Sequence, residues 1–196
     1  RTKNLISSEK QLNIFVISGP SGVGKDTLMD LIYEKYKQSV HIAITATTRK
    51  PRSNEKDGVN HFFKNENEFN DLISKKLLIE WAKVYDNFYG VPYSEIIDNL
   101  KIGKKVLLRV DVQGAKRLKN IIPNSNFIFI SPESENDLRL RLKKRHENSS
   151  TEIENRINES KKEVKEADWF DYIVINYPDK IEKAVEELTL LLGLVK

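Results

Sequence analysis

A glycine-rich loop carries the strongest chemical signal in the sequence. Residues 19–25 read Gly-Pro-Ser-Gly-Val-Gly-Lys; an apolar run at 14–17 precedes them and apolar residues at helical spacing follow over 28–36. Glycines let successive backbone N–H groups point inward, and a helix N-terminus adds about half a positive charge. Lys25 adds a full charge. In this strand-to-helix context the pattern predicts a loop that binds nucleotide phosphates, and it disfavours a chance glycine-rich turn.

The loop departs from the usual P-loop pattern at one position. The candidate phosphate-binding residues of the loop are Gly19, Pro20, Ser21, Gly22, Val23, Gly24 and Lys25. The next position normally holds a Ser or Thr that binds Mg²⁺, but here it is Asp26, followed by Thr27. The identity of any protein ligand to Mg²⁺ therefore stays open between Asp26 and Thr27, and we expect phosphates to hold the metal mainly.

Two further clusters could bind an anion or a base. Arg49 and Arg52 flank a proline that stiffens the turn, and paired planar guanidinium groups suit a phosphate. Glu80 precedes a tryptophan, and Tyr89 precedes a glycine. Taken alone, the arginine pair is more typical of a solvated basic turn, and the Glu80 cluster is typical of a structural loop.

Taken in order along the chain, these motifs resemble the guanylate kinase family. The motifs are Gly19–Lys25, Thr47–Arg52, Glu80–Trp81, Tyr89–Gly90, Asp111–Gly114 and Ile173–Asn176. They span nearly the whole chain after about Leu12. The resemblance implies transfer of the γ-phosphate of ATP to GMP, and by extension to dGMP, giving ADP and the diphosphate with Mg²⁺ as cofactor.

The resemblance implies a GMP site with carboxylates for the base and cations for the phosphate. Its members would be Thr45, Arg49, Arg52, His61, Glu80, Tyr89, Val91 and Asp111. Guanine offers N1–H and its 2-amino group as adjacent donors, whereas adenine has an acceptor at N1. Glu80 and Asp111 therefore predict rejection of AMP, because adenine would leave a buried charge unpaired. His61 stands where the family usually has Tyr, and Val91 where it usually has Ser or Thr.

The resemblance also implies an ATP side with closing arginines. Arg145 and Arg156, with Arg141 nearby, match arginines of the family's lid, and Asn176 matches a contact on the adenine side. Lys25, Arg145 and Arg156 would be the catalytic residues. A phosphate monoester is already an anionic nucleophile, so positioning and charge neutralisation suffice and no general base is needed. Each lid arginine could equally be an exposed helix charge.

Two departures from the family pattern form a pair. Asp26 replaces the P-loop Ser, and Arg109 replaces an acidic residue two positions before Asp111. In P-loop folds these positions lie close together, so the exchange preserves a contact with reversed polarity. We predict a direct ion pair between Asp26 and Arg109, within about 4 Å. Mg²⁺ would then be held mainly by ATP phosphates and water.

The elements needed to position these residues alternate along the chain. Buried strands are expected at 14–17, 106–110, 127–130 and 172–175, and helices at 28–36, from Ser134 through 142, at 153–164 and at 181–192. The pattern predicts an α/β P-loop fold of three layers, with a parallel core sheet covered by helices. The expected parts are a core (12–44, 102–140 and 168–196), a GMP-binding insertion with its own small core (45–101) and a lid (141–167). The charged stretch at 141–152 is expected to be a mobile lid or a solvated loop.

Composition limits the classes of protein. The chain has 196 residues, 39% of them hydrophobic, a net charge of +4 and no cysteine. This suits one domain without disulfides or thiolate metal sites, and we expect a cytoplasmic monomer. No apolar run reaches membrane-spanning length, and the basic residues form no stripe for nucleic acid. The remaining alternatives are a kinase for another nucleoside monophosphate and a non-catalytic guanylate-kinase-like domain that binds phosphopeptides. The intact glycine loop with Lys25 favours an enzyme.

Overall fold

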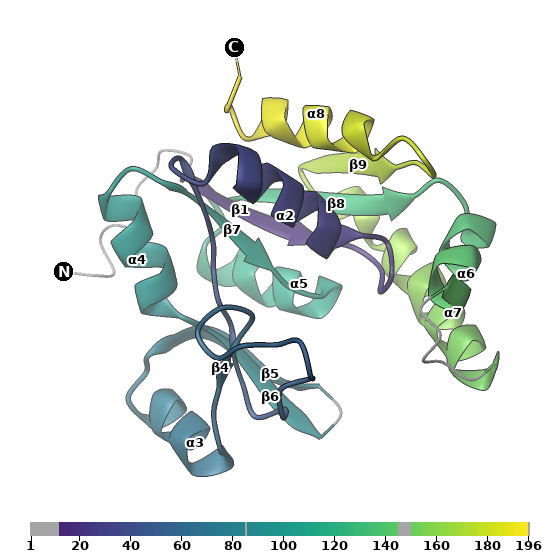
Figure 1. Ribbon diagram of the computed structural model, residues 1–196. Coiled ribbons are helices and arrows are strands. Elements are labelled where there is room, and N and C mark those ends of the chain that lie inside the picture. Colours follow the sequence, from purple (N-terminus) through teal and green to yellow (C-terminus); the bar gives the residue numbers. More distant parts are fainter. Residues whose placement is uncertain (1–11, 85, 145–149, 196) are drawn as a thin grey trace.

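The computed structural model describes residues 12–84, 86–144 and 150–195, and its core is a five-stranded parallel sheet (Figure 1). The strand order is β2-β7-β1-β8-β9. The strands are β1 (Ile14–Ser18), β2 (Val40–Ile42), β7 (Lys105–Arg109), β8 (Asn126–Pro132) and β9 (Tyr172–Asn176). Every neighbouring pair is parallel. The chain switches direction about β1, and ligands bind beyond the carboxyl ends of strands at such a point.

Helices cover both faces of this sheet. They are α2 (Lys25–Tyr36), α4 (Tyr93–Lys101), α5 (Val112–Ile121) and α8 (Ile181–Leu191). The chain also forms α6 (Glu135–Lys144), α7 (Ser150–Lys165) and a 3₁₀ turn at Ala167–Trp169. Alternate side chains of β1 divide between the two layers: Phe15 and Ile17 pack with α2 and α8, and Ile14 and Val16 pack with α4 and α5. The predicted three-layer α/β fold is confirmed.

The last strand differs from its prediction. Residues 172–175 were expected to form a buried strand, and β9 does form there. However, Tyr172 and Ile173 are 40% and 45% exposed, so the prediction of burial is wrong for the first half of the strand. The physical reason is that β9 is the edge of the sheet and pairs only with β8. Val174 is fully buried.

The insertion forms a second sheet with one helix of its own. The strand order is β4-β3-β6-β5. The elements are β3 (Ala46–Thr47), β4 (Phe62–Phe63), α3 (Glu66–Ser74), β5 (Leu78–Val84) and β6 (Asn87–Pro92). Ala46, Phe69 and Leu78 are buried together, which confirms the expected small core. Ile79 and Val91 instead join the core of the main sheet, so the insertion is packed firmly against it.

Helices α6 and α7 pack together at the far end of the molecule (Figure 1). Leu138, Leu142, Ile153 and Ile157 are buried between them. The helix predicted from Ser134 is confirmed, and the Ser134 Oγ accepts a hydrogen bond from the Asp137 N–H at 3.1 Å. The loop expectation for 141–152 is wrong for 141–144, because Leu142 buries its side chain and keeps this turn in α6. It is also wrong for 150–152, which begin α7, while 145–149 lie outside the described residues.

Within the residues that the structure describes, no helix is long and apolar enough to cross a membrane.

Candidate active site

The glycine loop lies between the end of β1 and the start of α2 (Figure 1). Gly22 and Gly24 have φ values of 86° and 96°, a left-handed conformation that side-chain-bearing residues rarely adopt. A Cβ on Gly19 would lie 2.2 Å from the carbonyl oxygen of Ile130 in β8. The loop can therefore take this path, close against the sheet, only with glycine at these positions.

Lys25 curls back over the loop that precedes it. Its Nζ donates to the carbonyl oxygens of Gly19 at 2.5 Å and Pro20 at 2.9 Å. Burial lowers the pKa of Lys25 to about 8, although the charges of Asp26 and Glu163 oppose this shift. The ammonium group is therefore mostly charged at pH 7 and is held at the centre of the loop, where a phosphate group would meet it.

Three of the predicted ATP-side residues brace this loop. The Asn176 side chain donates from Nδ2 to the carbonyl oxygen of Val23 at 2.7 Å and is almost fully buried. Arg141 Nη2 donates to the Asn176 carbonyl oxygen at 2.9 Å. Arg156, from α7, donates from Nη1 to the Ser21 Oγ at 3.3 Å. Arg145 lies outside the described residues.

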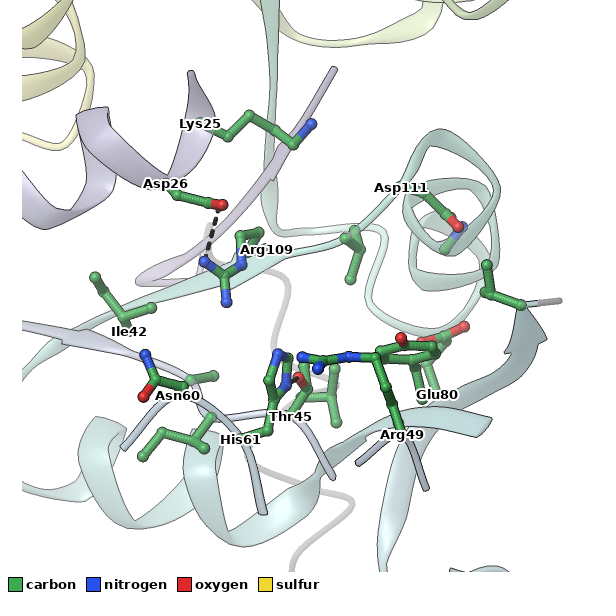
Figure 2. A pocket seen from close by; sticks show the side chains of 18 of the residues that line it. Lys25, Asp26, Ile42, Thr45, Arg49, Asn60, His61, Glu80, Arg109 and Asp111 are labelled. Carbon is green, nitrogen blue, oxygen red and sulfur yellow. Dashed lines mark hydrogen bonds and ion pairs between the residues drawn. The ribbon is translucent and has the colours of Figure 1, made fainter. Parts of the chain in front are cut away.

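Asp26 and Arg109 form the predicted ion pair. Arg109 Nη1 lies 2.8 Å from Asp26 Oδ1, which confirms the contact (Figure 2). Arg109 ends β7, and its guanidinium lies between the P-loop side of the cleft, with Lys25, and the side that carries His61 (Figure 2). Thr27, the other candidate metal ligand, is exposed on α2.

The basic turn of the insertion is held by one carboxylate. Glu55 Oε1 lies 2.7 Å from Arg49 Nη2, and Glu55 Oε2 accepts the backbone N–H of Arg52 at 2.8 Å. The hydrogen bond from Arg49 lowers the pKa of Glu55 to about 2. A hydrogen bond from Arg49 to Glu55, and another with Tyr89, raise the pKa of Arg49. Glu55 was missed in the sequence, although its position three residues after Arg52 is typical of a turn cap.

His61 and Thr45 face each other across the insertion. His61 Nδ1 lies 2.7 Å from the Thr45 Oγ1. Burial lowers the pKa of His61, and the positive charges of Arg109 and Arg49 lower it further. The imidazole is therefore neutral at pH 7 and carries a single ring proton.

The two candidate base-recognising carboxylates come from different elements. Glu80, on β5, is only 8% exposed, and burial raises its pKa while Arg117 opposes the shift. Asp111 caps α5 and accepts the backbone N–H of Gly114 at 2.6 Å. Arg117 was missed in the sequence. No pattern within α5 points to it, because its partner Glu80 lies 37 residues away in the sequence.

One open cleft of about 930 Å³ connects these groups. All of the candidate GMP residues line it, and so do Lys25, Asp26 and Arg109. Glu163, from α7, also lines it and was not singled out in the sequence. Burial raises the pKa of Glu163 to about 7, against the opposing charge of Lys25. The arrangement places a buried carboxylate for a base and two groups of cations for phosphates within one cavity.

Protein ligands for a metal are few near the P-loop. Among the described residues, no group of three or more His, Cys, Asp or Glu side chains could hold a metal ion. Asp26 is paired with Arg109 but remains exposed. Mg²⁺ commonly keeps several waters and binds through substrate phosphates and one or two carboxylates. The residues present therefore fit a metal that arrives with the nucleotide, with Asp26 beside it.

Comparison with known proteins identifies the family. The family model described as guanylate kinase matches residues 11–193. The chain belongs to the guanylate kinase family. The guanylate kinase of Caldanaerobacter subterraneus subsp. tengcongensis is 43% identical over 187 residues, covering 95% of this chain and 89% of that protein. The Bacillus subtilis guanylate kinase is 38% identical over 175 residues, covering 89% and 85%.

A solved structure of the same family has the same fold. The guanylate kinase from Anaplasma phagocytophilum superposes with a TM-score of 0.74 at 30% identity, covering 94% of this chain and 87% of that one. The resemblance noted in the sequence is thus confirmed for family, fold and enzyme class, that of a nucleoside monophosphate kinase. The roles of individual site residues stay predictions.

Proposed function

We propose that this guanylate kinase transfers the γ-phosphate of ATP to GMP inside the cleft that joins the P-loop to the insertion. The observation that carries this proposal is that every candidate GMP residue lines the same cavity as Lys25. dGMP is expected as a second acceptor, because the proposed contacts engage the base and the phosphate rather than the ribose.

The insertion, together with Asp111 of the core, would bind both the base and the phosphate of GMP. Glu80 and Asp111 accept the N1–H and 2-amino donors of guanine, and the Thr45 hydroxyl lies beside the same base edge. Arg49, Arg52 and Tyr89 hold the phosphate.

His61 assists at this phosphate as a neutral donor. The Thr45 hydroxyl holds one ring nitrogen at 2.7 Å, which leaves the other nitrogen for the ligand. Val91 is buried at the base site and contributes packing in place of a hydroxyl.

The P-loop side would bind and neutralise the phosphates of ATP. Backbone N–H groups of the loop and the Lys25 ammonium surround the β- and γ-phosphates. Arg156 already contacts Ser21 of the loop, and Arg145 would join it over the transferred group. Asn176 and Arg141 hold the loop in shape by their hydrogen bonds to it and to each other. The GMP oxygen attacks in line, and correct positioning supplies most of the rate.

Mg²⁺ would enter with ATP and offset charge on its phosphates. Arg109 engages one oxygen of Asp26, so this carboxylate is better suited to a water-mediated contact with the metal than to direct ligation. We also propose that the enzyme acts in the cytoplasm, since a chain without cysteine suits a reducing compartment. We further propose that it is a monomer, as is common in its family. Light scattering on a sizing column tests the oligomeric state.

A coupled assay of ADP release tests the activity. With ATP and Mg²⁺, GMP and dGMP should be turned over, and AMP and UMP should not. Absence of turnover with bound GMP would support a non-catalytic binding domain, and equal turnover of AMP would contradict the roles of Glu80 and Asp111. Lys25→Ala should abolish turnover and leave GMP binding nearly intact. Loss of both would show that the role of Lys25 is assigned wrongly.

A further inference from the structure

Arg117 contacts Glu80, one of the two carboxylates that the base site offers, from the helix that the other carboxylate, Asp111, caps. It belongs to α5, the helix that Asp111 caps, and its side chain lines the cleft. Its Nε and Nη2 atoms each lie 2.6 Å from Glu80 Oε1 on β5. The arginine therefore reaches from a core helix to the buried acid of the insertion.

The backbone of α5 leaves room for this reach. A Cβ on Gly114 would lie 3.2 Å from Asp111 Oδ1 and 3.6 Å from Arg117 Nη2. Gly114 is thus the point of the helix surface that both charged groups approach. Any side chain here would crowd the Asp111 carboxylate, and a large one would push the guanidinium away from it.

Burial favours the neutral form of Glu80, and Arg117 favours its anionic form. The Glu80 side chain is 6% exposed, and both burial and the negative charge of Asp111 raise its pKa. Arg117 is the group that lowers it. A protonated Glu80 would turn one acceptor into a donor, and guanine presents only donors along its N1 and 2-amino edge. The form that recognises guanine is therefore the form that burial disfavours.

The geometry of the ion pair leaves an acceptor for the base. Both short contacts fall on Oε1, whereas Oε2 receives no hydrogen bond from the residues that the structure describes. In the second carboxylate, Asp111, Oδ1 accepts a hydrogen bond from the Gly114 N–H. Each acid is thus fixed through one oxygen and retains the other for a ligand.

We propose that Arg117 is a positioning residue for guanine, which holds the Glu80 carboxylate as an anion in a fixed orientation beside Asp111. This deepens the proposed function, because it rests on Glu80 as the acceptor for guanine. Arg117 acts through Glu80 and touches no reacting atom. It contributes to the affinity for GMP and to the selection of guanine over bases that lack the 2-amino group.

The test replaces the cation and keeps the helix. Arg117→Gln removes the positive charge, and Arg117→Lys keeps the charge but lacks the planar guanidinium group. The matched control is Lys116→Gln, which removes the same charge one residue away, where Lys116 pairs with the half-buried Glu166 at 2.6 Å. Calorimetric binding of GMP and of IMP between pH 6 and pH 8 is measured for each variant, together with kcat and both KM values.

Arg117→Gln is expected to weaken GMP binding by about 10-fold or more at pH 7, with kcat at saturating GMP and the KM for ATP nearly unchanged. Loss of the cation raises the pKa of Glu80, so the loss of affinity should be larger at pH 6 than at pH 8. The ratio of GMP to IMP affinity should fall. Arg117→Lys should recover part of the loss, and Lys116→Gln should match the wild type. The phosphate of free GMP titrates in the same way in every measurement. A difference in pH dependence between variants therefore comes from the protein.

Equal affinity and equal pH dependence in Arg117→Gln and Lys116→Gln would overturn the proposal and leave Arg117 as a simple ion pair. Tighter GMP binding in Arg117→Gln would also overturn it, since Arg117 would then compete with the base. Failure of the wild-type protein to bind GMP would instead overturn the proposed base site itself. The two failures are therefore distinguishable.

Discussion

At the scale of single residues, the site consists of ionisable groups whose neighbours set their charge. Lys25 has its pKa lowered to about 8 by burial, and Glu163 has its pKa raised to about 7 by burial. Each opposes the shift of the other, since the two charges attract. The charge state of the P-loop therefore depends on a residue of α7 that no P-loop motif includes.

Replacement of Glu163 should lower the pH at which kcat/KM for ATP begins to fall on the alkaline side. In the wild type, kcat/KM for ATP should fall above about pH 8 as Lys25 loses its proton. Glu163→Gln removes a charge that raises the pKa of Lys25, so the fall should begin at lower pH. A pH profile between 6 and 9.5 measures this shift. Glu186→Gln, an exposed acid on α8, is the control, and an identical profile in the two variants would contradict the coupling.

The pair of Asp26 and Arg109 can be tested by a double replacement. Arg109→Ala leaves the Asp26 carboxylate unpaired next to the expected ATP phosphates, so the KM for ATP should rise about 10-fold through repulsion. Asp26→Ser in the same protein removes the repelling charge and should restore most of the affinity. Steady-state kinetics of both single variants and the double variant give the coupling. Additive effects would mean that the ion pair has no role in ATP binding.

At the scale of elements, the sequence predicted the features that depend on residues adjacent to one another in the chain. The loop from Gly19 to Lys25 and the helix after Ser134 were predicted because glycine conformation and helix capping depend on a few adjacent residues. The exposure of Tyr172 was not predicted, because edge position in a sheet depends on strands far away in sequence. Arg117 was missed for the same reason: its partner Glu80 is 37 residues away, and only the packing of α5 on β5 joins them.

The α6–α7 pair should control the P-loop through its packing. Leu142 is fully buried between the helices, and a Cβ on Gly22 would lie 2.7 Å from its Cδ2. Leu142→Ala should destabilise the fold by about 2–5 kcal/mol and raise the KM for ATP, because the support of the loop is lost. Leu140→Ala, 51% exposed on the same helix, is the control. Thermal melts and ATP kinetics check both, and equal behaviour of the two variants would contradict this role.

At the scale of the whole molecule, activity requires the insertion to present GMP to the P-loop at a fixed distance. The chain enters the insertion after β2 and returns to the core through α4. Glu95 on α4 links these two connections between the insertion and the core. Its Oε2 accepts the backbone N–H of Ile44 at 2.9 Å and lies 2.7 Å from His41 Nε2. One carboxylate thus ties both connections of the insertion to the core sheet.

Loss of this tie should affect both stability and GMP binding. Burial acts to raise the pKa of Glu95, but the hydrogen bonds from His41 and Ile44 outweigh it, so the pKa lies below the ordinary 4.5. A depressed pKa in the folded state gives stability that is present above pH 4.5 and is lost as the pH falls below it. Glu95→Gln should therefore lower the melting temperature at pH 7, by about 2–4 °C for each kcal/mol lost, and much less at pH 3.5.

The KM for GMP should rise as well, since the insertion loses its fixed orientation. Glu187→Gln, an exposed acid on α8, should change neither quantity, and a pH-independent difference in melting temperature for Glu95→Gln would contradict the electrostatic origin of this effect.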